Sequence, residues 1–267
     1  MLNKNKISRF LLRKNKAAHP QNSAFYNVYD QKKLDGNLTV ISYNIKYSRK
    51  IDEAIKLLID HEDLNNDGIL CLQEMTYEGV EKIAKTLQYN YIYYPAAVHR
   101  MARVNMGNAI LSKWPIIKHR KLILPRIDDS ASRRIAVQAT VKIEDKEIMF
   151  FSVHKEMMLR PRHRIKQVKQ IIDSIPTDIR YCVIAGDFNT FRDKTLKAIL
   201  QAFEEDGFTT ATGNVKWSYQ HWYFLNKKSR LDHIFSRGMD VINSGHVIDR
   251  SPSDHLPIWA EFSFRDS

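Results

Sequence analysis

The feature that most constrains the fold of this chain is a series of about a dozen short apolar runs, rich in β-branched and aromatic residues, as is typical of strands. The runs are spread over most of the 267 residues. A dozen strands exceed what one open sheet accommodates comfortably, so we predict two packed sheets. The predicted strands lie at residues 38–43, 68–72, 91–94, 108–111, 116–122, 135–143, 147–153, 181–185, 231–235, 241–247 and 257–262.

Amphipathic segments separate several of these strands. In residues 51–64 the apolar side chains recur at the i, i+3, i+4 spacing of a helix. Helices are also predicted at residues 77–87, 162–175 and 193–203. Strands with almost continuous apolar residues are buried on both faces, so the helices must cover the outer faces of the sheets. Residues 38–264 contain no repeat and no Pro/Gly-rich linker, which predicts one continuous α/β domain.

Acidic and amide side chains follow two of the apolar runs directly. Glu74 follows the run at residues 69–72, and Asp187 and Asn189 follow the run at residues 181–185. Asp254 comes a few residues after a shorter apolar pair, Val247-Ile248. Carboxylates gathered from distant strand ends supply the hard oxygen ligands that Mg²⁺ and Mn²⁺ prefer. Together with the histidines nearby, they indicate metal-assisted hydrolysis of a phosphoester.

Seven short motifs of this chain, in this order, resemble those of the endonuclease/exonuclease/phosphatase superfamily. Its members include pancreatic-type deoxyribonucleases, abasic-site endonucleases, inositol-polyphosphate 5-phosphatases and neutral sphingomyelinases. The motifs are Ser42-Tyr43-Asn44-Ile45, Leu72-Gln73-Glu74, Gly107-Asn108-Ala109-Ile110-Leu111-Ser112, Ser152-Val153-His154, Gly186-Asp187-Phe188-Asn189, Arg230-Leu231-Asp232-His233 and Ser253-Asp254-His255.

The resemblance runs from about residue 38 to 264. It implies a four-layer α/β sandwich, with two packed, mostly antiparallel or mixed sheets and outer helices. We therefore predict a catalytic domain at residues 38–267, preceded by a basic N-terminal arm and lead-in at residues 1–37.

The resemblance also implies a magnesium site, with manganese as the alternative ion. Glu74 and Asp254 would be metal ligands, and Asn44 would assist them. An acid at the end of an apolar strand is costly unless it has a partner, which favours Glu74 as a ligand over a helix-capping acid. Asp254 is either a ligand or an acid behind the ligands, and the amide of Asn44 can bind the ion or a phosphate oxygen.

Four residues receive catalytic roles from the same resemblance. Asp187 would activate the attacking water, with a metal role still open, and Asn189 would contact the phosphate. His255 would bond to the scissile phosphate. Asp232, 23 residues earlier, would orient His255 and raise its basicity. This pairing is a geometric prediction.

Three further residues are candidate contacts for phosphate, and two of them, His154 and Arg134, have a second interpretation. His154 is a phosphate binder or general acid, or else a packed core histidine, and the sequence shows no acidic partner for it. Asn108 and Arg134, or its neighbour Arg133, would contact substrate phosphate by resemblance. A solvated strand face is the alternative for Arg134.

The chain is basic, with 42 Lys and Arg against 30 Asp and Glu and a net charge of +12. Six of these charges lie within residues 1–20, which contain no acid. This arm is either a solvated tail or a segment that touches nucleic acid or an anionic membrane surface. Cys71 and Cys182 are predicted to be core thiols and not a disulfide.

No apolar stretch approaches the roughly 20 residues of a membrane span, and no secretory signal is evident. The cytoplasm is therefore the default location, with a membrane-peripheral position as the alternative. We expect an anionic phosphoester substrate and no obligate protein partner.

Three functions follow from these observations. The first is a phosphodiesterase acting on nucleic acid, which the basic charge favours. The second is a hydrolase of phosphorylated lipid headgroups or small phosphoesters. The aromatic cluster Trp217, Tyr219, Trp222, Tyr223 and Phe224 suits either, since it can stack on a base or pack on a lipid or sugar, or it can simply cover the core. The third is a binding module without catalysis, which the intact motifs disfavour.

Overall fold

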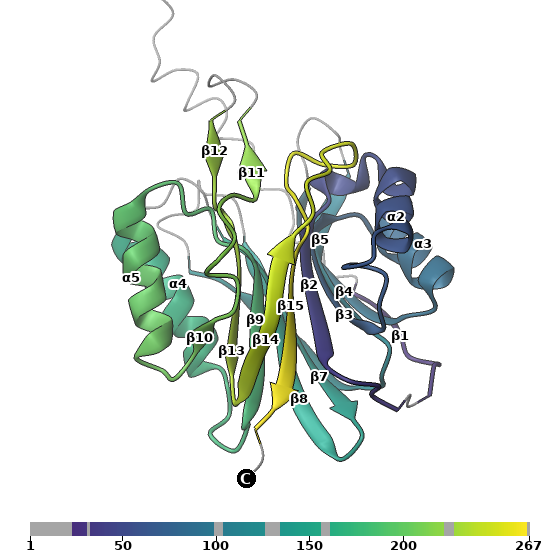
Figure 1. Ribbon diagram of the computed structural model, residues 1–267, viewed down its shortest axis with the longest axis horizontal. Coiled ribbons are helices and arrows are strands. Elements are labelled where there is room, and N and C mark those ends of the chain that lie inside the picture. Colours follow the sequence, from purple (N-terminus) through teal and green to yellow (C-terminus); the bar gives the residue numbers. More distant parts are fainter. Residues whose placement is uncertain are drawn as a thin grey trace, which may run out of the picture.

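Two mixed sheets pack face to face in the computed structural model, which describes residues 23–30, 33–98, 104–125, 134–155, 161–221 and 227–265 (Figure 1). The strand order is β1-β4-β5-β3-β2-β15-β14 in the first sheet and β10-β13-β9-β8-β7-β6 in the second. Neighbouring strands are antiparallel except for the parallel pairs β2–β3 and β8–β9.

The first sheet comprises β1 (Ala24–Tyr26), β2 (Leu38–Asn44), β3 (Gly68–Met75), β4 (Asn90–Val98), β5 (Asn105–Ser112), β14 (Met239–His246) and β15 (Ile258–Phe264). The second comprises β6 (Ile116–Ile123), β7 (Ile135–Ile143), β8 (Lys146–His154), β9 (Tyr181–Asp187), β10 (Thr209–Thr210) and β13 (Asp232–Arg237). A separate ribbon pairs β11 (Tyr219–Gln220) with β12 (Lys228–Ser229).

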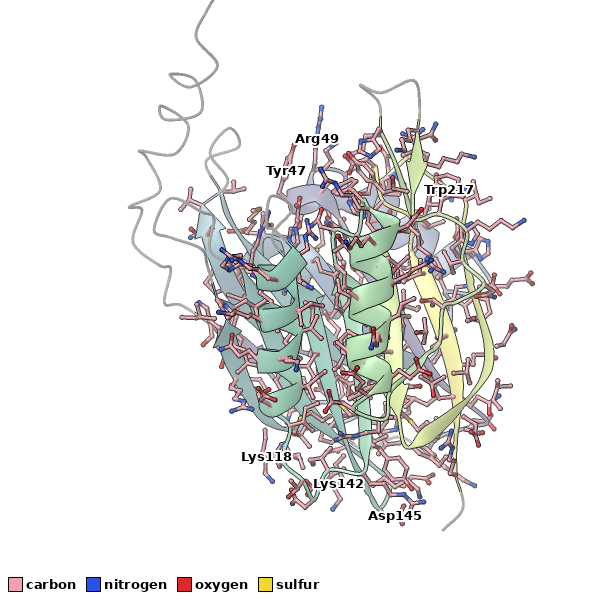
Figure 2. The ribbon with its side chains drawn as sticks, turned by 90° about the vertical axis from the view of Figure 1, so that its left-hand side faces the viewer. Tyr47, Arg49, Lys118, Lys142, Asp145 and Trp217 are labelled. Carbon is pink, nitrogen blue, oxygen red and sulfur yellow. The ribbon has the colours of Figure 1, made fainter. Side chains whose placement is uncertain are left out.

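Helices cover the outer face of each sheet. The first sheet carries α2 (Ile51–Asp60) and α3 (Tyr77–Leu87), and the second carries α4 (Pro161–Asp173) and α5 (Asp193–Glu204). Figure 2 shows α4 and α5 side by side in front of their sheet. The four layers confirm the predicted α/β sandwich.

The helix ends follow from local chemistry. The Oγ1 of Thr76 accepts a hydrogen bond from the Gly79 amide at 3.1 Å and so begins α3, because the first amides of a helix lack partners within it. Gln88 ends the same helix in the left-handed conformation. Helix α2 ends at Asp60 and is shorter than predicted, because His61 is extended.

Period-two alternation places the strand side chains on two faces. In β2, Leu38 and Val40 enter the core between the sheets, whereas Ile41 and Tyr43 pack under α2 and α3. The second sheet does the same, with Val183 facing the other sheet and Ile184 facing α4 and α5. Each such fully buried aliphatic side chain stabilises the fold by about 1.5–3 kcal/mol.

The side chains that face the other sheet change from apolar to polar towards one end of the molecule. In β2, for example, Leu38 and Val40 are followed on the same face by Ser42 and Asn44. The buried polar residues at this end are Ser42, Asn44, Gln73, Asn108, Ser152, His154, Asp187 and Asp232. This end of the space between the sheets is therefore where polar chemistry can occur.

Some predictions about elements were incomplete or wrong. Strand β1, within the predicted lead-in, pairs with β4, and β10, β11 and β12 were not predicted because strands of two or three residues carry almost no periodic signal. Strand β14 ends at His246, so Val247-Ile248 is not part of it. Asp254 lies in the loop before β15 and does not follow a strand directly.

Several predictions fall outside the described residues or remain untested. The basic arm at residues 1–20 lies outside them, as do Arg133 and residues 222–224 of the aromatic cluster. The division into 1–37 and 38–267 stays a prediction. Within the described residues, no helix has the length and apolar character to cross a membrane. Cys71 and Cys182 are free and buried, as predicted.

Candidate active site

The predicted site residues meet at the polar end of the two sheets. Asn44, Glu74, His154 and Asp187 lie at or near the carboxyl ends of their strands, and Asp232 begins β13. Strand pairing sets Asp187 opposite both His154 and Asp232. In Figure 2, Tyr47 and Arg49 mark this end of the molecule, and Lys118, Lys142 and Asp145 mark the other.

Asp187 is the centre of this group. Its carboxylate is buried and accepts hydrogen bonds from the Asn189 amide at 2.8 Å and from Asn44 Nδ2 at 3.3 Å. Burial raises the pKa of Asp187 to about 7, although the His255 charge acts in the opposite direction. A carboxyl with such a pKa exchanges protons readily near neutral pH.

The Gly-Asp-Phe-Asn motif owes its shape to tight backbone packing. Gly186 has φ +151°, and a Cβ there would lie 2.0 Å from the Val153 carbonyl oxygen of the neighbouring strand. Phe188 is buried and packs on Phe203 and Phe235, which anchors the strand end. Asn189 is left-handed, with φ +53°, and its Nδ2 donates to Lys155 O at 2.9 Å. The motif is therefore a fixed strand end and not a mobile turn.

The predicted pairing of Asp232 with His255 is present. His255 Nδ1 lies 2.8 Å from Asp232 Oδ2, both side chains are buried, and His255 Nε2 lies 3.9 Å from Asp187 Oδ2. Burial opposes protonation of His255, but the charge and hydrogen bond of Asp232 outweigh it and raise the pKa of His255 to about 10. Asp232 thus holds the ring in place and favours the imidazolium.

Two serines that the sequence analysis did not assign hold these segments together. Ser253 Oγ donates to Asn44 O at 2.7 Å and accepts from the His255 amide at 3.2 Å, which ties the loop before β15 to the end of β2. Ser218 Oγ accepts from the Leu231 and Asp232 amides at 3.0 Å. Ser253 stands within a recognised motif, whereas no sequence signal marks Ser218.

Glu74 reaches the site through an irregularity in β3. The pairing of β3 with β5 shifts register between Leu72 and Met75, and Glu74 is left-handed with φ +54°. Its Oε1 lies 3.7 Å from His154 Nε2, and its side chain is 22% exposed. The preceding Gln73 is fully buried, donates through Nε2 to Cys71 O at 2.8 Å and Ser152 Oγ at 3.1 Å, and leaves Oε1 without a hydrogen-bond partner.

His154 faces carboxylates that the sequence could not pair with it. Its Nε2 lies 3.6 Å from Asp187 Oδ2 as well as near Glu74, and Arg134 NH1 lies 3.0 Å from the same nitrogen. Burial, together with the charges of Arg134 and His255, holds the pKa of His154 well below its usual range. Arg134 is half-buried against this ring, so it does not lie on a solvated strand face.

Asn108 has a structural contact in addition to its predicted role. Its side chain is buried, and Nδ2 donates to Ile135 O at 3.2 Å and Ser152 O at 3.0 Å. The amide therefore links β5 of one sheet to β7 and β8 of the other. Its contact with substrate phosphate stays a prediction.

The donor set fits a hard divalent cation. Asn44, Glu74 and Asp254 offer oxygen atoms at the same end of the sheets, and no thiolate is among them. Burial disfavours the charged form of Asp254, but His255 and the Lys46 ammonium, 2.7 Å from its Oδ2, hold its pKa below the usual range. Asp254 is thus an ionised carboxylate that already carries a cationic partner.

A second grouping of possible ligands involves Asp187, Asp232 and His255, whose nearest ligand atoms lie within 4.8 Å of one another. The Asp232–His255 hydrogen bond engages Asp232 Oδ2 and His255 Nδ1, whereas Asp232 Oδ1 has no hydrogen-bond partner among the described residues. This trio is thus a second possible metal site beside the predicted ligands Glu74 and Asp254.

Residues 41–255 match the Endonuclease/Exonuclease/phosphatase family. The chain belongs to this family. Enzymes of the family hydrolyse phosphoesters and generally depend on a divalent metal.

Solved structures with this fold act on different substrates. TDP2 from D. rerio, solved with a single-strand DNA product, superposes with a TM-score of 0.67 at 17% identity and covers 86% of this chain and 100% of that one. A mannosyl-6-phosphatase from Bacteroides thetaiotaomicron gives a TM-score of 0.63 at 18% identity, covering 85% of this chain and 100% of that one. At these identities the likeness shows the fold alone.

A curated relative matches over a shorter segment. A UPF0294 protein of Vibrio vulnificus is 28% identical over 98 residues, which is 37% of this chain and 33% of that protein. The chain therefore matches about a third of the length of this relative.

An aromatic group borders the site of this family member. The ring of Tyr219 lies 4.7 Å from that of His255, and Phe191 and His221 pack next to Tyr219. All three side chains are half-buried. Trp217 is not part of this aromatic group, because its ring contacts His246 and the Lys228 ammonium. The predicted aromatic cluster therefore does not act as one surface among the described residues.

Proposed function

We propose that this chain is a Mg²⁺-dependent phosphodiesterase that acts on nucleic acid, with Mn²⁺ as an alternative ion. The observation that carries this proposal is the buried Asp232–His255 pair, which points the Nε2 of a cationic histidine towards Asp187 at the polar end of the two sheets. Protonated imidazole, carboxylate and a bound metal can together support in-line phosphoryl transfer to water.

Each residue has a role in this mechanism. Glu74 and Asp254, assisted by Asn44, would hold the metal, which supplies charge neutralisation at the phosphate. Asp187 accepts the proton of the attacking water, and its raised pKa suits it to this task near neutral pH. The amide of Asn189 would contact the phosphate.

Two histidines would interact with the phosphate oxygens. His255, kept cationic by Asp232, stabilises the negative charge that develops on the phosphate oxygens. His154 is neutral because its pKa is lowered, so it suits a hydrogen bond to a phosphate oxygen better than proton donation to the leaving group. Arg134, which contacts His154, would add a positive charge beside that oxygen.

Two observations support nucleic acid as the substrate. The Tyr219, Phe191 and His221 rings beside His255 can stack on a base, as aromatic side chains commonly do in single-strand binding. The net charge of +12 favours a polyanion, and the basic arm at residues 1–20 would add contacts to its backbone. TDP2, which shares the fold, was solved with a DNA product.

The second candidate is a phosphatase or phospholipase-type hydrolase of small phosphoesters or lipid headgroups. The structural likeness to a mannosyl-6-phosphatase favours it. In that case the basic arm would contact an anionic membrane surface. A binding module without catalysis remains the least favoured function, because each predicted catalytic group is present at the site.

A substrate panel distinguishes these functions. It would contain single- and double-stranded DNA, RNA, abasic DNA, sphingomyelin, phosphoinositides and a sugar phosphate, each with Mg²⁺ and with EDTA. We expect cleavage of a nucleic acid in Mg²⁺ only. Cleavage confined to a lipid or sugar phosphate would establish the second candidate, and the Asp187→Asn variant, which should be inactive, excludes a contaminating enzyme.

A further inference from the structure

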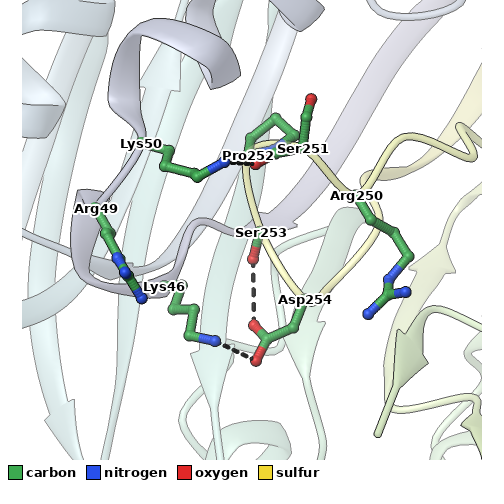
Figure 3. A pocket seen from close by; sticks show the side chains of 8 residues that line it. All are labelled: Lys46, Arg49, Lys50, Arg250, Ser251, Pro252, Ser253 and Asp254. Atoms are coloured by element: carbon green, nitrogen blue, oxygen red, sulfur yellow. Dashed lines mark hydrogen bonds and ion pairs between the residues drawn. The ribbon is translucent and has the colours of Figure 1, made fainter. Parts of the chain in front are cut away.

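A basic pocket adjoins the candidate active site on the side of Asp254. It has a volume of about 290 Å³ and lies between the segment after β2 and the loop before β15. Figure 3 shows its lining, with Arg49 and Arg250 approaching from the two sides and the Lys46–Asp254 ion pair between them. The lining residues are Lys46, Arg49, Lys50, Arg250, Ser251, Pro252, Ser253 and Asp254.

The charges of this pocket are unbalanced. Four lining side chains are cationic and one is acidic. Lys46 is paired with Asp254 at 2.7 Å, and Lys50 is paired with Glu53 at 2.9 Å. Within the described part of the chain, the guanidinium groups of Arg49 and Arg250 have no hydrogen-bond or ion-pair partner. Two guanidinium groups are thus available to a ligand.

The pocket is preformed by contacts on both sides. Lys46, Tyr47 and Ser48 are all left-handed, and Ser48 Oγ accepts from the Thr76 amide at 3.1 Å, which holds this unusual segment against α3. On the other side, Asp249 Oδ1 accepts from the Ser251 amide at 2.8 Å. Lys50 Nζ donates to Ser251 O at 2.7 Å and joins the two sides.

The pocket and the reaction centre share residues. The Lys46 amide donates to Asn44 Oδ1 at 3.1 Å, and Ser253 Oγ donates to Asn44 O. Asp254, which lines the pocket, precedes His255. An anion bound in this pocket would therefore lie next to residues that belong to the reaction centre.

We propose that this pocket binds a second phosphate of the substrate, next to the scissile phosphoester in a nucleic-acid strand. The inference rests on the proposed phosphodiesterase function. It predicts that a strand with a second phosphate beside the scissile one is a better substrate than an isolated phosphodiester. A guanidinium group binds phosphate through two parallel charge-assisted hydrogen bonds, so an arginine on each side of the pocket offers such a contact to a phosphate that enters it.

The test compares two substrates. Bis(p-nitrophenyl) phosphate has one phosphodiester and no second phosphate, whereas a short oligonucleotide has both. The Arg49→Gln/Arg250→Gln variant should lose at least about tenfold in kcat/KM on the oligonucleotide, since each charge-assisted hydrogen bond contributes about a factor of ten. Its turnover of bis(p-nitrophenyl) phosphate should stay within about twofold of the wild type.

A matched control removes the same charge elsewhere. The Lys118→Gln/Lys142→Gln variant loses two positive charges at the opposite end of the molecule and should behave as the wild type on both substrates (Figure 2). An equal loss for both double variants, or no selective loss for the arginine variant, would overturn the second-phosphate site. An inositol bisphosphate in place of the oligonucleotide shows whether the second phosphate belongs to a strand or to a headgroup.

Phosphate binding without metal separates this inference from the proposed function. In EDTA, calorimetric titration with inorganic phosphate should show binding that weakens at least about tenfold in the arginine variant and is unchanged in the lysine variant. This readout does not depend on turnover. Equal phosphate affinity in the wild type and the arginine variant would contradict the pocket site, whereas absent turnover with selective phosphate binding would contradict only the phosphodiesterase.

Discussion

At the scale of single residues, the proposed reaction depends on Asp232 acting through His255. The Oδ2 of Asp232 is bonded to His255 Nδ1 at 2.8 Å, so this carboxylate sets the orientation and charge of the ring. The Asp232→Asn variant should therefore keep its KM and lose about 10²-fold in kcat, as expected when an electrostatic stabiliser of the transition state is weakened. Steady-state kinetics on bis(p-nitrophenyl) phosphate measure this. A change confined to KM would mean that Asp232 serves substrate binding instead.

His233, next in the chain, offers a test of stability against pH. Burial lowers its pKa to about 3, and its Nε2 is bonded to Thr190 Oγ1 at 2.9 Å. Between pH 6.5 and about 3 the unfolded chain binds the proton and the folded one does not, so the free energy of unfolding falls as pH drops, by up to about 1.4 kcal/mol per unit.

The His233→Gln variant should reduce this loss of stability. The raised pKa of Asp187 makes the free energy of unfolding rise as pH drops, which is the opposite sign. Because Asp187 is present in both proteins, the difference between their pH dependences of stability reports on His233 alone. Urea unfolding at pH 7.5 and pH 5 supplies the comparison. Parallel changes in wild type and variant would show that His233 does not titrate in this window.

At the scale of elements, the end of β9 depends on Gly186. A Cβ there would meet the Val153 carbonyl oxygen at 2.0 Å, and φ is +151°. Because β8 and β9 would have to separate, Gly186→Ala should lower the free energy of unfolding by at least about 2 kcal/mol. Gly213→Ala is the matched control, since the nearest atom to its Cβ would be 3.9 Å away. Equal urea midpoints for the two variants would refute this account of the strand end.

The elements also show what the sequence could predict. Strands such as β7 and β9 alternate or run apolar for long enough to be recognised, and the polar residues that end them, such as Asp187, were correctly placed at one end of the sheets. Helix α2 was predicted too long because periodicity does not show where the backbone becomes extended.

The contacts between distant loops could not be predicted. The Lys46–Asp254 ion pair joins residues 208 positions apart. It depends on the left-handed segment at residues 46–48, which contains no glycine from which this conformation could be predicted. The carboxylates beside His154 were also missed, because the bulge in β3 that turns Glu74 towards this ring leaves no pattern in the sequence. The Asp232–His255 pair was predicted only through the family resemblance.

At the scale of the whole molecule, charge should control the reaction with a strand. If the reaction centre and the basic pocket each hold a phosphate, log kcat/KM for an oligonucleotide should fall with log salt concentration with a slope of about −1.4 or steeper, at roughly −0.7 per phosphate. Turnover of bis(p-nitrophenyl) phosphate should depend much less on salt. Kinetics between 50 and 200 mM NaCl measure both slopes. Equal slopes would argue against a polyanionic substrate.

The central proposal is that this chain is a metal-dependent phosphodiesterase and that His255 stabilises the transition state. The most direct measurement is hydrolysis of bis(p-nitrophenyl) phosphate by the wild type and by His255→Ala, each with Mg²⁺ and with EDTA. We predict turnover only in Mg²⁺, with a loss of about 10²–10³-fold in the variant, the range for removal of one electrostatic stabiliser of the transition state. Turnover that survives either the substitution or the chelator would contradict the account.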